Sequence, residues 1–239
     1  MEHADIILGL VACLASFIGT TARFGGDLVL LGLLFGHVQI SALIPLHASV
    51  ETVRNLPRSL ILLRTVSWRL VLLYGIGVIL GVLIGVRMAV DFPLGLLSLV
   101  LGVTFLVAAW LPPLGFSSDF LGKFAILGGF QGFLSMFIGF AEHLDRPFLE
   151  RDIRSPNRIE GTLAWQMLIL NAAKVAVFTM FGYRVLDFAQ SLTMMLVGAI
   201  AGFGLGIMAK PFVSERFAQI MLQFIATALA LRLFSIALL

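Results

Sequence analysis

Charged and polar side chains interrupt the apolar stretches of this sequence in both of its halves. A charge at the centre of a bilayer costs about 3 kcal/mol or more, so such residues are paired, hydrated or functional. We therefore expect them to bind a substrate or a coupling ion. They are Arg23, Asp27, His47, Ser49, Glu51 and Arg54 in the first half, and Glu142, His143, Asp145, Gln166, Asn171 and Lys174 in the second.

Two pairs of these residues have helical spacing. Glu51 and Arg54 are three residues apart, as are Asn171 and Lys174, so each pair shares one face of a helix. For Glu51 and Arg54, an intrahelical ion pair and a role in substrate binding are equally good interpretations. Lys174 has no acidic residue at helical spacing, which favours an anion ligand, with snorkelling of its ammonium group toward the interface as the alternative.

The dipeptide Gly25-Gly26 permits a sharp break of the backbone close to Arg23. An apolar run begins at Leu28, and a helix there would present free backbone N–H groups and a positive dipole end to an anion. Glycine-mediated packing of helices is the alternative interpretation.

Two histidines and three carboxylates are candidates for ion coupling. Histidine as a residue type titrates near neutral pH, which makes His47 and His143 candidate proton carriers, although a buried neutral histidine held by hydrogen bonds is the more frequent case. The carboxylates are those of Glu51, Glu142 and Asp145. The predicted substrate-binding residues are Arg23, Gly25, Gly26, His47, Ser49, Arg54, His143, Gln166, Asn171 and Lys174.

The sequence contains no zinc-ligand spacing, no nucleotide-binding loop and no Gly-x-Ser-x-Gly motif. We therefore expect neither a metal nor another cofactor. The energy for any transport would come from gradients of ions or substrate, or from a partner.

Composition places the chain in a membrane. Of its 239 residues 60% are hydrophobic and only 12% are charged, and the mean hydropathy is +1.06. Several runs approach the roughly 20 apolar residues that a helix needs to cross a bilayer. The net charge of +3 is spread over loops and forms no basic patch, so the expected partners are a lipid bilayer and a small anion, and no nucleic acid.

The sequence repeats itself at an offset of 120 residues. Phe17-Ile18-Gly19 recurs as Phe137-Ile138-Gly139, and the same offset relates Arg54 to Lys174. These matches predict two related transmembrane repeats, residues 1–115 and 116–239. Further matches, within one residue of this offset, are Arg23 with His143, Arg64 with Arg184, Trp68 with Phe188, and Gly81/Gly85 with Gly202/Gly206.

Each half is predicted to contain a short apolar helix, an interrupted segment and three longer helices. The predicted ranges are 6–22, 24–36, 40–63, 69–88 and 93–111, then 121–140, 141–150, 159–182, 188–208 and 213–237. The second interrupted segment is too polar to face lipid, which favours a re-entrant hairpin buried against protein or lining a cavity.

Loop charges favour this re-entrant topology. If both interrupted segments turn back, eight loop cations lie on one side of the membrane and only Arg87 and Arg184 on the other. If both segments cross, the same residues divide six against four. We therefore predict inverted repeats with both termini outside the cytoplasm. The eight cations are Arg64, Arg69, Lys123, Arg151, Arg154, Arg158, Lys210 and Arg216.

The chain resembles the sulfite exporter TauE/SafE family of bacterial membrane transporters, within the 4-toluene sulfonate uptake permease superfamily. The resemblance is clearest from Gly132 to Gly139 followed by Pro147-Phe148-Leu149, and it extends to Ser67-Trp68-Arg69 and to Gly81-x-x-x-Gly85-x-Arg87. The family's consecutive glycines are replaced here by residues 141–143 and 21–23. The resemblance implies transport of a sulfur-containing anion across a bacterial inner membrane, without enzyme activity.

A secondary transporter with alternating access is the leading interpretation, because substrates of inverted-repeat transporters bind near the midplane. Arg23, Arg54, His143 and Lys174 are then expected to converge on one cavity. An anion channel, a membrane enzyme that uses Glu142 and His143, and a structural subunit are the alternatives. The direction of transport, the coupling ion and assembly into a homo-oligomer are left open.

Overall fold

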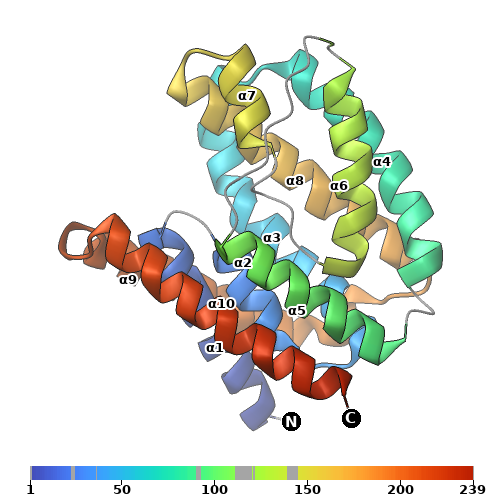
Figure 1. Ribbon diagram of the computed structural model, residues 1–239, viewed down its shortest axis with the longest axis vertical. Helices are drawn as coiled ribbons and strands as arrows, with labels where there is room; N and C mark the ends of the chain where they lie inside the picture. Colours follow the sequence, from blue (N-terminus) through green and yellow to red (C-terminus); the bar gives the residue numbers. More distant parts are fainter. Residues whose placement is uncertain are drawn as a thin grey trace. The chain divides into compact units, whose positions relative to one another are not determined.

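A computed structural model gives the fold of residues 2–22, 25–35, 37–89, 93–110, 120, 122–138 and 145–238 (Figure 1). In these residues Phe35 and Val38 form an isolated bridge, and there is no β-strand. Three short 3-10 turns are η1 (Leu63–Thr65), η3 (Val185–Phe188) and η4 (Lys210–Phe212). The helices are α1 (Glu2–Ala22), α2 (Gly26–Leu34), α3 (Ile40–Ile61), α4 (Trp68–Ala89), α5 (Leu94–Trp110), α6 (Lys123–Ile138), α7 (Arg146–Asp152), α8 (Pro156–Met180), α9 (Ala189–Ala209) and α10 (Glu215–Ala237).

Helices α1, α4, α8, α9 and α10 are long and apolar enough to cross a membrane, and α5 and α6 are shorter apolar helices. Large apolar side chains such as Ile84 and Phe203 are exposed on them, as expected of surfaces that face lipid. The prediction of an all-α polytopic membrane protein is therefore confirmed. Helix α3 has 22 residues and is more polar, because it carries Glu51, Arg54 and Arg58.

The order of α-helices is the same in the two sequence halves. Each has a helix, a short helix, a longer helix, a 3-10 turn and two further helices, and among the described residues the second half has an additional 3-10 turn, η4, between α9 and α10. The short helices α2 and α7 lie in the two segments that hydropathy marks as interrupted. Helix α2 begins directly after Gly25 and α7 directly after Asp145, 120 residues further along the chain. The boundary of the repeats at residues 115 and 116 remains a prediction.

The chain forms two compact units, and each takes helices from both sequence halves. Unit 1 comprises Met1–Val50, Phe92–Leu111 and Arg184–Leu239. Unit 2 comprises Glu51–Asp91 and Pro112–Tyr183. Helix α3 therefore contributes its first part to unit 1 and its second part to unit 2.

Within unit 1, α1 packs along α9, and α5 packs along α10. The α1–α9 pair is close because small residues leave the backbones in contact. A Cβ atom on Gly198 would overlap the carbonyl oxygen of Gly9, and one on Gly202 would overlap that of Cys13. Packing of this kind replaces the hydrophobic effect, which cannot drive helices together inside lipid.

Unit 2 contains the corresponding pair, α4 packed along α6. A Cβ atom on Gly77 would overlap the carbonyl oxygen of Ala125, and one on Gly81 would overlap that of Gly129. Helix α8 packs on α4 from the other direction, and the Trp68 and Trp165 rings meet edge to face with centroids 4.9 Å apart.

The α1–α9 pair and the α4–α6 pair can be aligned in two ways, by their glycine contacts or by the sequence repeat. The two alignments differ by four residues, or about one helical turn. Gly9 and Gly129 are 120 residues apart, and they face Gly198 and Gly81 respectively. Gly198 therefore occupies the place of Gly81, whereas the sequence repeat aligns Gly202 with Gly81. The sequence itself favours the alignment by the repeat, because it pairs Gly77, Gly81 and Gly85 with Gly198, Gly202 and Gly206, whereas the alignment by contacts pairs only two glycines of each helix.

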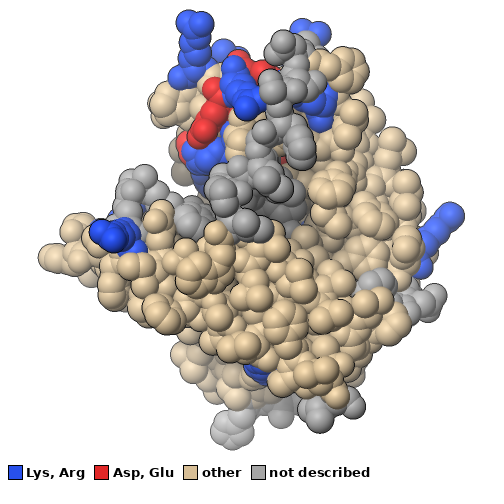
Figure 2. Space-filling view, in the orientation of Figure 1, with Lys and Arg blue, Asp and Glu red and all other residues tan. Residues whose placement is uncertain are grey.

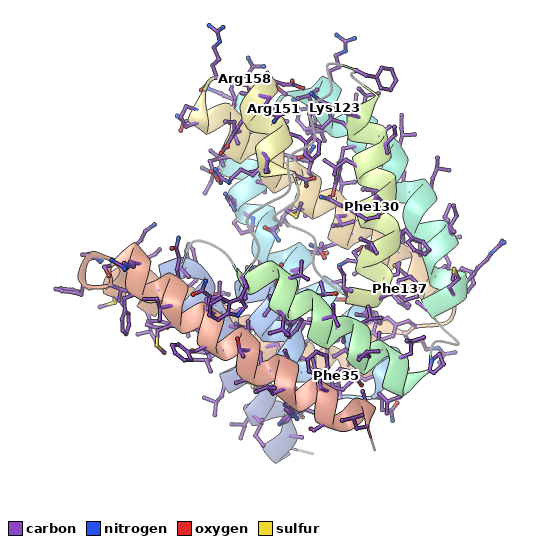
Figure 3. All side chains as sticks on the ribbon, in the orientation of Figure 1. Phe35, Lys123, Phe130, Phe137, Arg151 and Arg158 are labelled. Atoms are coloured by element: carbon purple, nitrogen blue, oxygen red, sulfur yellow. The ribbon has the colours of Figure 1, made fainter. Side chains whose placement is uncertain are left out.

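The start of α6 and the end of α7 lie at the same end of unit 2. Lys123 Nζ, at the start of α6, lies 3.0 Å from Asp152 Oδ1, at the end of α7. Arg158, early in α8, donates a hydrogen bond of 2.9 Å to Ser67 Oγ just before α4. Figure 3 shows Lys123, Arg151 and Arg158 near one another at this end, where basic and acidic side chains gather in Figure 2.

Within unit 2, the second part of α3 runs antiparallel to α8. Ser59 Oγ donates to the Ala164 carbonyl at 3.0 Å, and Trp165 Nε1 donates to the Ser59 carbonyl at 2.8 Å. A Cβ atom on Gly161 would lie 3.1 Å from the carbonyl oxygen of Leu62. Residues later in α3 therefore lie beside residues earlier in α8.

Candidate functional site

Buried polar side chains form a cluster in each unit, and these clusters are the candidate site. Fully or almost fully buried are His47, Ser49, Glu51, Asp145, Gln166, Asn171 and Lys174 from the sequence predictions. Arg23, Glu142 and His143 lie outside the described residues, so their predicted roles stay predictions. None of the other predicted polar residues is fully exposed, and Arg54 retains 24% of its side-chain exposure.

In unit 1 the cluster surrounds the start of α2. Gly25 has a φ of 81°, a left-handed conformation that glycine adopts without strain, so the backbone breaks where the sequence predicts. His47 Nε2 lies 3.0 Å from the Asp27 carbonyl oxygen and so ties α3 to the first turn of α2. The Ser49 hydroxyl donates to the Pro45 carbonyl within α3 at 2.8 Å.

Asp27 changes the electrostatics of this helix start. Its carboxylate is 1% exposed and has no hydrogen-bond partner among the described residues. A negative group in the first turn already occupies the favourable end of the helix dipole. The start of α2, with Gly25 and Gly26, is therefore a weaker candidate for an anionic substrate than the glycines alone suggest.

In unit 2 the second part of α3 carries an ion pair. Arg54 Nη2 lies 2.7 Å from Glu51 Oε2, at the i to i+3 spacing that the sequence indicates. Asn55 Nδ2 donates to the Glu51 carbonyl at 2.8 Å and lies 3.4 Å from Glu51 Oε2. The structure therefore contains the intrahelical ion pair, and the partial exposure of Arg54 leaves part of its guanidinium accessible.

Helix α8 carries the other three predicted ligands. Lys174 is 0% exposed, which does not fit a side chain that snorkels out to an interface. Asn171 Nδ2 donates to the Met167 carbonyl at 3.1 Å, while its Oδ1 atom has no partner among the described residues. Neither amide atom of the fully buried Gln166 has one there either. Buried polar atoms of this kind are sites where a ligand or water binds.

Asp145 belongs to a hydrogen-bonded chain that the sequence analysis missed. The Tyr74 hydroxyl donates to Gln131 Oε1, and Gln131 Nε2 donates to Asp145 Oδ1 at 2.6 Å. Burial raises the pKa of Asp145 well above its ordinary value, and hydrogen bonds from Gln131 and Tyr74 lower it only in part. A glutamine inside the apolar helix α6 was the available signal, because a buried amide needs partners.

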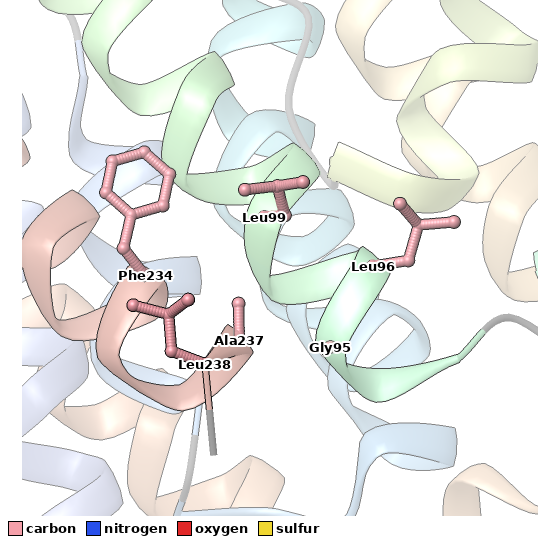
Figure 4. A pocket seen from close by; sticks show the side chains of 6 residues that line it. All are labelled: Gly95, Leu96, Leu99, Phe234, Ala237 and Leu238. Atoms are coloured by element: carbon pink, nitrogen blue, oxygen red, sulfur yellow. The ribbon is translucent and has the colours of Figure 1, made fainter.

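The surface depression between α5 and α10 offers no alternative site for an anion. No polar side chain lines it (Figure 4). The described residues also contain no group of three or more His, Cys, Asp or Glu side chains placed to hold a metal ion. The lining residues of the depression are Gly95, Leu96, Leu99, Phe234, Ala237 and Leu238.

Comparison with known proteins identifies the protein family of this chain. The family model described as "Sulfite exporter TauE/SafE" matches residues 8–233, which is almost the entire sequence. No curated protein and no solved structure matches the chain significantly. The family is one of membrane transporters of sulfite-type anions, in agreement with the apolar helices and the buried basic side chain described above. This multi-pass membrane protein belongs to the sulfite exporter TauE/SafE family.

Proposed function

We propose that this protein is a secondary transporter that moves a small sulfur-containing anion across a bacterial inner membrane by alternating access. The candidate substrates are sulfite, sulfoacetate and other sulfonates. The observation that carries this proposal is the complete burial of Lys174 within a chain of a sulfite exporter family. A buried ammonium is costly, and binding an anion is a reason to keep it.

The packing of α3 against α8 supports a shared role for Arg54 and Lys174. Ser59 lies beside Ala164 and Trp165, and the two helices run antiparallel. If this register continues along both helices, Glu51 lies level with Ala172, next to Asn171, and Arg54 lies level with Ile169, five residues from Lys174. Two cationic groups would then approach one region of unit 2 from facing helices.

This set of groups suits a sulfonate or sulfite. Each anion presents three oxygens, and charge-assisted hydrogen bonds to them are about twice as strong as neutral ones. Lys174 and Arg54 would supply the charge, and the amide of Gln166 would supply a neutral donor. Gly25, Gly26, His47 and Ser49 of unit 1 remain predicted contacts with weaker support.

Three observations support inverted repeats. Helices α3 and α8 are corresponding elements of the two halves and run antiparallel, whereas parallel repeats would place them in the same direction. The chain from Lys123 to Asp152 returns to the end where it entered. Six of the eight cations that the re-entrant topology assigns to the cytoplasm lie at or next to that end. They are Arg64, Arg69, Lys123, Arg151, Arg154 and Arg158.

The test is anion binding and exchange by the purified full-length protein. Calorimetric titration with sulfite, sulfoacetate, an aromatic sulfonate and their carboxylate analogues should give saturable binding that favours the sulfur anions. In liposomes, labelled anion inside should exchange with unlabelled anion outside. Unitary currents would instead identify a channel, and chemical turnover of the anion would identify an enzyme. Absence of both binding and exchange for every sulfur anion would refute the proposal.

A further inference from the structure

Asp145 is buried at the N-cap position of α7, but its side chain does not cap the helix. It precedes α7 at the N-cap, where aspartate normally accepts a hydrogen bond from the first turn, but its side chain makes no such bond. It is 0% exposed. Oδ1 accepts the hydrogen bond of 2.6 Å from Gln131, and Oδ2 has no partner among the described residues.

Three separate elements of unit 2 hold this carboxyl group in place. Tyr74 is on α4, Gln131 is on α6, and Asp145 lies in the turn before α7. All three side chains are fully buried. Because the Tyr74 hydroxyl donates to Gln131 Oε1, the amide is oriented with its NH₂ group toward Asp145. The corresponding position of the first half is Gly25, so only one half carries the acid.

Several charged groups on the surrounding elements form ion pairs. Lys123 pairs with Asp152, and Glu160 accepts hydrogen bonds from both Arg58 and Arg146. None of these pairs includes Asp145. The charged residues on the elements that pack around it are Arg69 and Arg87 on α4, Lys123 on α6, Arg146, Glu150, Arg151 and Asp152 on α7, and Arg158, Glu160 and Lys174 on α8.

We propose that Asp145 is the group that binds and releases the coupling proton of this transporter, and that Tyr74 acts through Gln131 as a positioning residue. The inference rests on the proposed transport function and adds its energy source. One O–H bond forms at the Asp145 carboxyl when a proton arrives from water on one side of the membrane. The same bond breaks when the proton leaves on the other side.

The surroundings of the carboxyl group suit such a cycle. Desolvation favours the neutral acid, which is why its pKa lies well above the ordinary value. The bond from Gln131 favours the ionised form, so both forms are stabilised to some extent. A group of this kind changes its protonation state when a conformational change alters its access to water or its contact with Gln131.

Infrared spectroscopy tests the proton site without reference to any substrate. The detergent-purified full chain should show the carbonyl band of a protonated carboxyl at pH values where exposed aspartates are ionised. Asp145→Asn should lose this band, whereas Asp152→Asn, which alters a surface ion pair of the same helix, should keep it. Identical bands in wild type and Asp145→Asn would overturn the proposal.

A second variant tests the positioning role and avoids the removal of a buried charge. Tyr74→Phe deletes only the hydroxyl that orients Gln131. Gln131, which the Tyr74 hydroxyl orients, donates to the Asp145 carboxylate and lowers its pKa, so loss of that hydroxyl should move the midpoint of the infrared titration to higher pH. An unchanged midpoint in a folded Tyr74→Phe protein would show that Tyr74 does not act on this carboxyl.

Transport in liposomes tests coupling itself, with labelled sulfoacetate as the probe. Wild type should accumulate the anion when a pH gradient is imposed and should not respond to a sodium gradient. Asp145→Asn should lose this accumulation but keep the exchange of labelled for unlabelled anion at equal pH. Exchange without any response to pH in wild type would overturn proton coupling and leave the transport function intact. Absence of exchange in wild type would count against sulfoacetate as substrate, while the infrared result would stand independently.

Discussion

Lys174 is the residue on which the anion site depends most. Its side chain is completely buried in α8, in a stretch that otherwise contains Ala, Val and Phe. Replacement of a whole buried ion pair by apolar side chains is often neutral or stabilising, whereas removal of one partner of such a pair costs about 3–5 kcal/mol. A test of Lys174 in anion binding must therefore be made on a variant that is shown to be folded.

Lys174→Met, compared with wild type in protein that circular dichroism shows to be folded, should lose high-affinity anion binding. Loss of a charge-assisted contact in a desolvated site costs about 2 kcal/mol or more, or roughly thirtyfold in affinity. Calorimetric titration with sulfite and sulfoacetate measures the change. Arg154→Ala, on the exposed segment before α8, is the control and should bind as wild type does. Wild-type affinity in Lys174→Met would return Lys174 to a packing role.

The ion pair between Glu51 and Arg54 gives a prediction of opposite sign. Glu51 neutralises Arg54 at 2.7 Å, so an anion must compete with this carboxylate for the guanidinium. Glu51→Gln keeps the shape and removes the competing charge, and sulfite affinity should therefore rise severalfold. Glu160→Gln makes the same chemical change in a surface ion pair and should have no effect. Unchanged affinity in Glu51→Gln would mean that Arg54 does not contact the anion.

The polar residues could be found from the sequence because each stands alone in an apolar stretch. The ion pair of Glu51 with Arg54 follows from their spacing along one helix. The absence of an acidic residue at helical spacing from Lys174 can also be read from the sequence. The contact of Gln131 with Asp145 and Tyr74 cannot, since it joins three elements and depends on how they pack. The Asp27 carboxylate, which has no hydrogen-bond partner in the described part of the chain, could not be foreseen for the same reason.

At the scale of helices, glycine spacing decides which pairs approach closely. On α9, Gly202 lies against the backbone of α1, while Gly204 has no neighbouring atom within 4 Å of the Cβ position. The two glycines are only two residues apart on one helix, so they differ in the face on which they lie. This makes them a matched pair for testing the contact.

Gly202→Ala should destabilise the protein by about 1–3 kcal/mol, because its methyl group would overlap the carbonyl oxygen of Cys13 and force α1 and α9 apart. Gly204→Ala should be neutral or stabilising by roughly 0.5–1 kcal/mol, since alanine is the better helix former. Thermal unfolding in detergent, followed by circular dichroism, compares the two. Equal stability of both variants would contradict the α1–α9 packing.

Helix positions were predictable to within a few residues, because hydropathy marks the spans and Gly, Pro and polar residues mark the breaks. The partners of the helices were not. Sequence neighbours such as α4 and α5 would be the simplest expectation, yet α1 packs along α9 and α4 along α6. Nearly every helix here is apolar on several faces, so hydropathy carries no information about which face meets which helix.

For the molecule as a whole, the proposed topology places the basic end of unit 2 in the cytoplasm. In a background in which Cys13 is replaced by alanine, Arg69→Cys and Arg154→Cys should both be protected from membrane-impermeant thiol reagents in intact cells. Arg184→Cys, in the exposed turn after α8, should be labelled. Labelling of Arg69→Cys or of Arg154→Cys, but not both, would rule out the re-entrant arrangement of the second interrupted segment.

Because α1 packs along α9, it meets this partner only after about four fifths of the 239 residues have been synthesised. Unit 2 is different, since all its segments lie between Glu51 and Tyr183 and can assemble while the rest is still being translated. Contacts between distant parts of a chain form slowly, because a long loop must close before they do. During that interval the face of α1 that carries Gly9 and Cys13 is open to lipid and to other helices. Packing of the inserted helices should therefore begin in unit 2 and end with the α1–α9 contact of unit 1.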